Sequence, residues 1–252
     1  MIVGTTVENW YQSDFSYSVD LIDTFVTIVE KQTKEAILEF QTKKQVEYIE
    51  ADLGHGIEAQ PVETHLGLDD MTWSLDSIFQ EYFPSLQRRS ALLTVYGFFE
   101  YELHKLCMLF QREQQLRLAP KDLQGEGIER SADYLQKVVG LALDKTCKEW
   151  QAVTWVREIR NAVVHRDGQR KSADGTIPKT MVNALANLRF YSGDAAIVLD
   201  EGFVPQAVAI FKAYFKVIGE SIQKNIQLGT ILQARQSTIA GWPTSLGTQS
   251  RR

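Results

Sequence analysis

The stretch from Ser85 to about Leu118 constrains the fold most, because apolar residues cover most of its circumference when it is wound as a helix. Its centre carries a long apolar set: Leu92, Leu93, Val95, Tyr96, Phe98, Phe99, Leu103, Leu106, Cys107, Leu109 and Phe110. A helix that is apolar nearly all round must be covered on several sides, as the central member of a bundle is. The stretch therefore predicts an all-α helical bundle packed around residues 85–118.

The same periodicity and the usual helix start and stop signals place the other elements. We expect one long helix over 16–52 and a loop over 54–72. Shorter helices are expected over 72–83, 131–139 and 179–188, and a last helix over 205–225. Pro84 should break or kink the chain ahead of the central helix. Between residues 189 and 203 the period becomes that of two short strands around Ser192-Gly193-Asp194, which predicts a small β-hairpin.

Three parts follow from this pattern: an N-terminal long helix or arm with its loop (1–70), a helical domain (71–225) and a flexible C-terminal tail (226–252). The N-terminal helix suits either packing within the bundle or dimerisation, and the sequence favours neither. His55 and His65 lie in the expected loop among acidic residues, but without the fixed short spacing of metal ligands, so no metal site is expected.

Composition and charge narrow the class of protein. A net charge of −5 argues against a general nucleic-acid coat. No apolar run approaches the roughly 18 residues of a membrane-spanning helix, and the first ten residues lack the features of a signal peptide. Cys107 and Cys147 both fall in expected helices, which favours free thiols. We therefore expect a cytoplasmic protein with no membrane association.

The stretch Trp155–Arg166 carries the candidate site. Wound as a helix, it stacks Arg157, Asn161 and His165 along one face at spacings of four, with Arg160 on the flank. We expect no carboxylate to partner the two arginines on this face, although Glu158 could reach Arg157 sideways. The opposite face should be buried and carries Ala152, Trp155, Val156, Ile159 and Val163. Thr146 should cap the start of the helix, with Glu149 completing a capping box.

Positive charge is concentrated around this stretch. Between residues 157 and 171 five basic residues face two acidic ones, and the basic set is Arg157, Arg160, Arg166, Arg170 and Lys171. A basic island of this size on an acidic protein suits a site that engages one phosphate group better than a long nucleic-acid groove. Charge clusters of this size also arise by chance.

The segment Arg160-Asn161-Ala-Val-Val-His165 resembles the R-x(4–6)-H signature of the HEPN superfamily, in which a polar residue often follows the arginine. The segment from Arg89 to Cys107 is similar to the long core helix that such bundles carry upstream of the motif. The resemblance covers roughly residues 85 to 225. It implies a helical bundle, and many such proteins are metal-independent endoribonucleases, toxins or antiphage effectors.

The resemblance also implies a chemistry, in which the ribose 2′-hydroxyl attacks the adjacent phosphate and expels the 5′-oxygen. It assigns His165 as general acid or base, a role that suits imidazole near neutral pH. Arg160 would hold the scissile phosphate, because a guanidinium stays charged and can stabilise a phosphorane. Asn161 would orient His165 or the phosphate, and Arg157 and Arg166 would bind the substrate. No metal and no other cofactor is implied.

In members of the superfamily, two motif helices face each other across a two-fold axis and complete the site, so a homodimer with a composite cleft is expected. The expected partners are an RNA substrate, such as tRNA or mRNA, and an inhibitor or antitoxin protein. Two alternatives stay open: a non-catalytic HEPN-type module that binds RNA, a nucleotide or a protein, and a plain helical scaffold. An Arg160 buried against Glu100, with His165 pointing away, would favour the scaffold.

Overall fold

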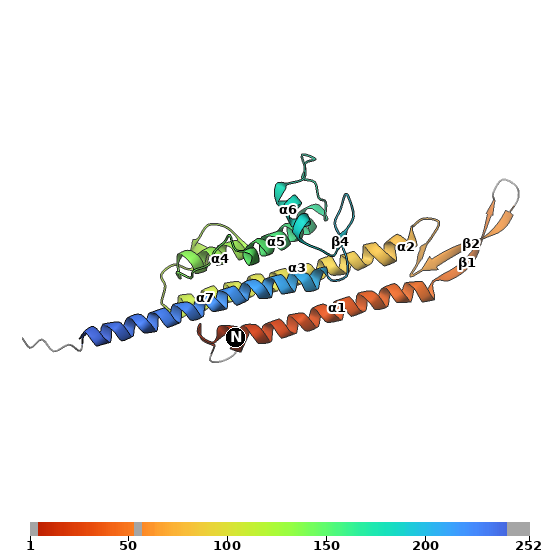
Figure 1. Ribbon diagram of the computed structural model, residues 1–252. Helices are drawn as coiled ribbons and strands as arrows, with labels where there is room; N and C mark the ends of the chain where they lie inside the picture. Colours follow the sequence, from red (N-terminus) through yellow and green to blue (C-terminus); the bar gives the residue numbers. More distant parts are fainter. Residues whose placement is uncertain (1–4, 53–56, 241–252) are drawn as a thin grey trace, which may run out of the picture.

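The computed structural model describes residues 5–52 and 57–240, and its long helices lie side by side in an elongated bundle (Figure 1). The three long helices are α1 (Ser16–Lys43), α3 (Phe83–Glu113) and α7 (Phe203–Ala240). The fold class is the expected one, a helical bundle with a small β-hairpin. Within the described residues no helix is both long and apolar enough to cross a membrane.

Helix α3 is the central member, as its apolar circumference predicts. Its core side chains are inaccessible to solvent and include Leu92, Val95, Phe99, Leu103, Leu106 and Cys107. The Phe99 ring stacks on Phe211 of α7 at a centroid distance of 4.6 Å, and Phe15, just before α1, stacks on Phe215 at 4.5 Å. Helices from both ends of the chain thus converge on α3.

A second group of helices covers another side of α3 (Figure 1). It consists of α4 (Gly127–Lys137), α5 (Lys148–Arg166) and α6 (Lys179–Asn187). The expected hairpin follows as β4 (Tyr191–Ser192) paired antiparallel with β5 (Val198–Leu199). Short helical turns at Tyr11–Phe15 and Pro120–Asp122 complete the set.

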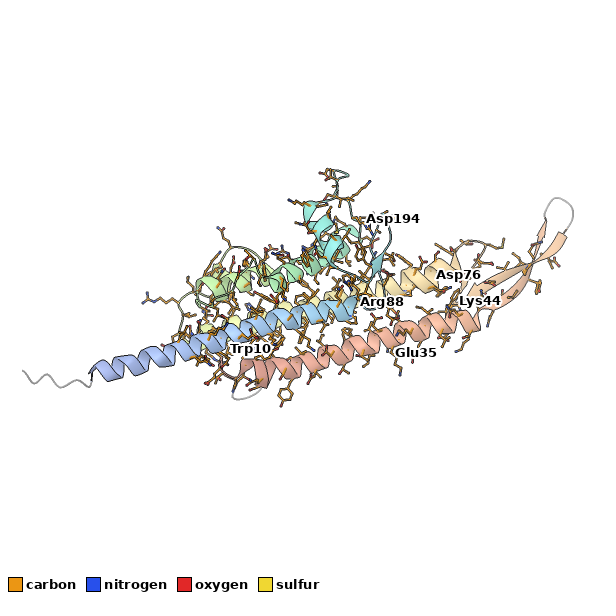
Figure 2. The ribbon with its side chains drawn as sticks, viewed as in Figure 1. Trp10, Glu35, Lys44, Asp76, Arg88 and Asp194 are labelled. Carbon is orange, nitrogen blue, oxygen red and sulfur yellow. The ribbon has the colours of Figure 1, made fainter. Side chains whose placement is uncertain are left out.

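One buried ion pair ties these layers together. Arg88 of α3 lies 3.1 Å from the Glu30 carboxylate of α1, and it also donates to the Leu199 carbonyl of β5 at 3.3 Å. Both side chains are nearly inaccessible, at 7% and 12% exposure. Figure 2 shows Arg88 inside the bundle, between these elements.

The expected helix over 16–52 is wrong in its last part. Helix α1 ends at Lys43, and the chain continues as β1 (Gln45–Asp52), which pairs antiparallel with β2 (Ile57–His65). A short β3 (Leu68–Asp69) extends the sheet beside β2. From Gln45 to Tyr48 polar and apolar residues alternate, which is the two-residue period of a strand, and Ile49 then breaks the alternation. The expected loop over 54–72 is largely strand, and His55 lies outside the described residues.

Pro84 does not break the helical path. A short helix α2 (Leu75–Ser77) leads through a π-helical turn (Ile78–Tyr82) directly into α3, in which Pro84 is the second residue. A π turn widens the helix locally, which accommodates a proline that lacks an N–H and crowds the preceding turn.

The expected flexible tail over 226–252 is wrong as far as residue 240. Helix α7 begins at Phe203 and continues to Ala240 instead of ending near residue 225. The extra stretch is rich in good helix formers such as Gln, Leu and Ala, interrupted by one glycine, Gly229. Residues 241–252 lie outside the described part.

Candidate functional site

Helix α5, which carries the motif, begins one residue later than expected. Its N-cap is Cys147, whose sulfur accepts a hydrogen bond from the Trp150 amide at 3.4 Å. Thr146 is not the cap, because its own amide and hydroxyl both donate to the Asp144 carboxylate at 2.7 Å. Because Thr146 is engaged in this local turn with Asp144, it does not cap the helix. The predicted capping box is therefore wrong.

The buried face of α5 is rotated from the expected one. The buried residues are Trp150, Val153, Val156, Ile159 and Ala162. Only Val156 and Ile159 belong to the predicted set, while Trp155 and Val163 are half-buried. This rotation follows from packing against α3, α6 and α7 together. It also turns Arg160, next to the buried Ile159, toward α3.

Arg160 is held by an aromatic ring and an amide. Its guanidinium carbon lies 5.0 Å from the centroid of the Tyr96 ring, a cation–π distance, and its Nη1 donates to Asn161 Oδ1 at 3.0 Å. Its buried Nε has no hydrogen-bond acceptor in the part of the chain that the structure describes. Burial, and next the Glu100 carboxylate, raise the pKa of Tyr96 to about 12, so its phenol stays protonated at neutral pH.

Beside Arg160 the structure has a small polar cavity of about 410 Å³. Its walls come from α3, the start of α4 and α5, and they comprise Tyr96, Glu100, Glu126, Gly127, Ile128, Glu129, Arg157, Arg160 and Asn161. Three of the predicted site residues, Arg157, Arg160 and Asn161, therefore meet in one pocket. Gly127 has a φ of +56°, and a Cβ there would lie 3.0 Å from Glu100 Oε2. The left-handed backbone at Gly127 favours glycine, and the Glu100 carboxylate lies directly against it.

The expectation that no carboxylate partners these arginines is wrong. Arg157 Nη1 lies 2.5 Å from Glu129 Oε1, across the pocket from α5. Glu100 lines the same pocket but, as far as the described residues show, forms no ion pair with Arg160. The start of α4 therefore brings carboxylates to the arginines from a segment about 30 residues upstream, a contact that the helix pattern of α5 does not contain.

Arg166 and His165 lie outside this pocket. Arg166 Nη2 contacts Glu158 Oε1 at 3.0 Å, and its Nη1 contacts Ser172 Oγ at 3.3 Å, so it ties the end of α5 to the following loop. His165 is exposed, and no hydrogen bond or ion pair engages its imidazole within the described residues. Five helical residues separate His165 from Arg160, a turn of about 500°, so the two side chains point about 140° apart.

Arg89, which positions the end of α5, cannot be predicted from the residue spacing within α5. Arg89 of α3 is buried, and it donates to Asp167 Oδ1 at 2.9 Å and to the Ile197 carbonyl at 2.7 Å. Asp167 has a φ of +49° and caps the C-terminal end of α5, two residues after His165. A Cβ at the next residue, Gly168, would meet the Arg89 guanidinium at 2.6 Å. Arg89 thereby fixes the end of the motif helix, and only the tertiary contact reveals it.

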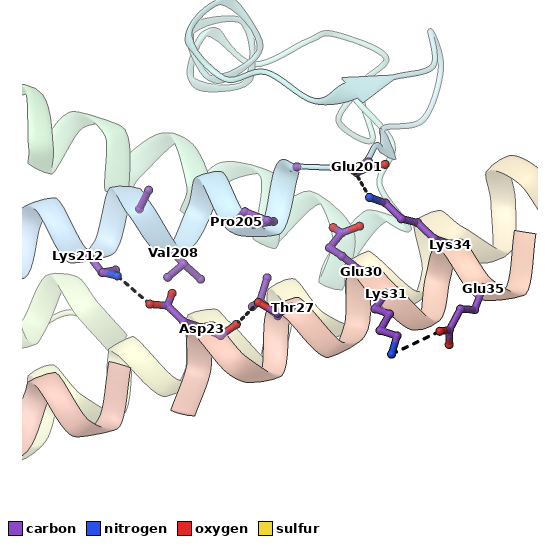
Figure 3. A pocket seen from close by; sticks show the side chains of 13 residues that line it. Asp23, Thr27, Glu30, Lys31, Lys34, Glu35, Glu201, Pro205, Val208 and Lys212 are labelled. Atoms are coloured by element: carbon purple, nitrogen blue, oxygen red, sulfur yellow. Dashed lines mark hydrogen bonds and ion pairs between the residues drawn. The ribbon is translucent and has the colours of Figure 1, made fainter. Parts of the chain in front are cut away.

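A larger cavity of about 810 Å³ lies between α1 and α7, away from the motif (Figure 3). Apolar residues such as Val26 and Val208 line it, and ion pairs span it. Lys34 contacts Glu201 at 2.7 Å, and Lys212 contacts Asp23 at 2.8 Å. It contains none of the predicted site residues. Its ion pairs link α1 to α7 and to the turn just before α7.

Across the part of the chain that the structure describes, no group of three His, Cys, Asp or Glu side chains could hold a metal ion. His65 is buried against the rings of Phe40 and Phe79. No family model matches this chain, and no curated protein and no solved structure shows a detectable similarity to it.

Proposed function

We propose that this chain is a metal-independent endoribonuclease of the HEPN type that cleaves RNA by 2′-hydroxyl attack within a homodimer. The observation that carries the proposal is the pairing, on one helix, of an arginine held in place with an exposed imidazole that forms no hydrogen bond or ion pair within the described residues. Arg160 is fixed by Tyr96 and Asn161, whereas His165 is exposed.

The reaction needs a base that takes the 2′-hydroxyl proton, an acid that protonates the leaving 5′-oxygen, and a cation for the phosphorane. Imidazole suits both proton transfers near neutral pH. Arg160 supplies the cation, and Asn161 sets the direction of its guanidinium through the 3.0 Å hydrogen bond. One protomer has a single motif histidine, so two protomers together supply both the acid and the base.

The divergence of Arg160 and His165 is itself a reason to propose a dimer, since one protomer does not aim both at one phosphate. Contacts at Arg89–Asp167 and at Tyr96–Arg160 make α3 and α5 antiparallel. Leu93 and Val164 are therefore at the same level, and both are exposed apolar residues, at 36% and 44%. Two exposed apolar side chains beside the motif suit a self-complementary two-fold contact.

The carboxylates of the pocket favour a second candidate function, that of a helical scaffold or a non-catalytic binding module. Glu129 already occupies Arg157, and Glu100 lies beside a partly buried Arg160 while His165 points elsewhere. This is the arrangement that a helical scaffold would have, and a non-catalytic binding module could use the same arginines without cleavage. A role as a toxin or antiphage effector in the cytoplasm, restrained by an inhibitor protein, rests on the motif resemblance alone.

The test incubates the full chain with labelled single-stranded RNA and with total tRNA in EDTA, beside Arg160→Ala and His165→Ala. We expect fragments with 2′,3′-cyclic phosphate ends, reduced by about 100-fold or more in both variants. His104→Ala, on α3 and outside the pocket, is the matched control and should cleave normally. Cleavage that survives in either site variant, or an inert wild-type dimer that binds the same RNA, would reject the nuclease in favour of the binding module.

A further inference from the structure

The two-stranded ribbon formed by β1 and β2 projects beyond the ends of the helices of the bundle (Figure 1). The pairing is regular, with Gln45 opposite Thr64 and Glu50 opposite Ala59. The sheet order is β1-β2-β3, so the outer edge of β1 has no neighbouring strand within the described residues. Such an edge offers a row of backbone N–H and C=O groups to another strand.

The base of the ribbon is built to hold it in a fixed direction. A small apolar cluster, separate from the main core, contains Phe40, Leu75 and Phe79. His65, the last residue of β2, packs edge-on against Phe79 at a centroid distance of 4.7 Å. Lys44, which Figure 2 shows where the ribbon leaves α1, contacts Glu63 at 2.7 Å. A two-stranded ribbon alone is only marginally stable in water, so this anchoring is what keeps it projecting.

One face of the ribbon exposes apolar side chains. Residues opposite each other in register share a face, so Tyr48 lies with Pro61, and Val46 lies on the same side two residues away. Tyr48 is 72% exposed and Val46 is 53% exposed, and Pro61 is exposed as well. The opposite face of the ribbon is less exposed, because Val62 on that side is buried.

The ribbon is also strongly acidic. Between residues 45 and 65 the sequence has five carboxylates, at Glu47, Glu50, Asp52, Glu58 and Glu63, and no lysine or arginine. The net charge of the whole chain is −5, so the rest of the molecule is close to neutral. Two ribbons of this charge repel each other, which disfavours pairing between β1 edges of two copies, whereas a basic strand is attracted.

We propose that the free edge of β1 over residues 45–50 is a docking site for an extended, basic segment of a partner polypeptide, which adds as a third strand. The backbone of β1 supplies hydrogen bonds, as in other cases of strand addition. Glu47 contacts basic side chains on one face of the segment, and Tyr48, on the opposite face, covers its apolar ones. Glu50 adds negative charge to the same edge. This site is independent of the proposed nuclease chemistry, because it lies beyond the end of the helical bundle (Figure 1) and shares no residue with the motif pocket.

The probe is a fluorescein-labelled ten-residue peptide of alternating lysine and valine, added to the full chain and followed by fluorescence anisotropy. Two control peptides separate the contributions. One has N-methyl groups on alternate amides, which removes backbone donors and leaves the charge unchanged, and the other replaces lysine by glutamate. We expect binding of the basic peptide, with both controls weaker by about tenfold or more. Hydrogen exchange should slow over residues 45–50 when the basic peptide is bound.

Two double variants test the site itself. Glu47→Lys with Glu50→Lys should weaken peptide binding by about tenfold or more, while Asp20→Lys with Glu220→Lys, which changes the net charge equally at exposed helix positions, should not. Equal binding of the N-methylated peptide, or equal loss in both double variants, would reduce the effect to non-specific charge attraction and overturn the proposal. A chain that self-associates, with residues 45–50 protected in the dimer and exposed again in Tyr48→Ser, would assign the edge to a second copy instead.

Discussion

Replacing Glu129 by glutamine should tighten the binding of RNA to the motif pocket. Glu129 lies 2.5 Å from Arg157 and competes with any phosphate for that guanidinium. A carboxylate about 4 Å from a phosphate repels it by about 1 kcal/mol in bulk water and by about 4 kcal/mol at an effective dielectric constant of about 20. Because Arg157 is 31% and Glu129 47% exposed, the lower figure applies. We expect a Kd lower by roughly fivefold to tenfold.

The assay is fluorescence anisotropy with a short labelled RNA whose 2′-hydroxyls are methylated, so that binding is measured without cleavage. The gain should shrink at about 1 M salt, where the Debye length is about 3 Å. Glu39→Gln is the matched control, since it removes a carboxylate from an exposed ion pair with Lys43, at 3.0 Å on α1. If Glu129→Gln and Glu39→Gln bind the RNA equally, the pocket around Arg157 does not receive a phosphate and the reasoning fails.

Three further outcomes follow from the contacts described above. A mixture of Arg160→Ala and His165→Ala chains should cleave no faster than either variant alone, because a mixed dimer keeps one His165 and the proposed site uses both as acid and base. Recovery to about a quarter of the wild-type rate would contradict the two-histidine mechanism, since it would mean that one Arg160 and one His165 across the dimer suffice. Arg88→Ala should lower the free energy of unfolding by about 3–5 kcal/mol, because it leaves the Glu30 carboxylate buried and unpaired. Urea titration measures this free energy, and a decrease below about 1 kcal/mol would mean that water reaches Glu30. Burial raises the pKa of Cys107 to about 12, so the thiol should resist iodoacetamide in the folded protein at pH 8.5. The contribution of Cys107 to the free energy of unfolding should fall as the pH rises from about 9 toward 12, because only the unfolded chain ionises there. Rapid alkylation of Cys107 under native conditions would show that α3 opens.

Helical periodicity predicted the bundle because its signal is long and local. The apolar circumference of residues 85–118 allows only a central position, and α3 occupies it. The hairpin after α6 was likewise predicted from the change of period around Ser192-Gly193-Asp194. The ribbon at residues 45–65 was missed because its first strand continues directly from a helical pattern, with Lys44 as the only residue between them. Because residues 45–50 are exposed on both faces of the strand, their sequence shows little difference in hydrophobicity between a buried face and a solvent face.

The candidate site was predicted in part. Arg157, Arg160 and Asn161 do share a pocket, because residues three and four apart on one helix are neighbours wherever that helix is placed. Tyr96 and Glu129, which hold the two arginines, come from other helices and could not be found from spacing within α5. Arg89, which fixes the end of α5 through Asp167, was missed for the same reason.

The sequence by itself determined the helical class, the central place of α3 and the presence of an arginine–asparagine–histidine face on α5, since each depends on the period of a single helix. Only the tertiary structure decided how α5 is rotated, because that rotation balances packing against three neighbouring helices at once. The rotation turns Arg160 onto Tyr96, brings the α4 carboxylates to Arg157 and leaves His165 in solvent. Contacts between segments distant in the chain have no period, so they become visible only when the helices are packed.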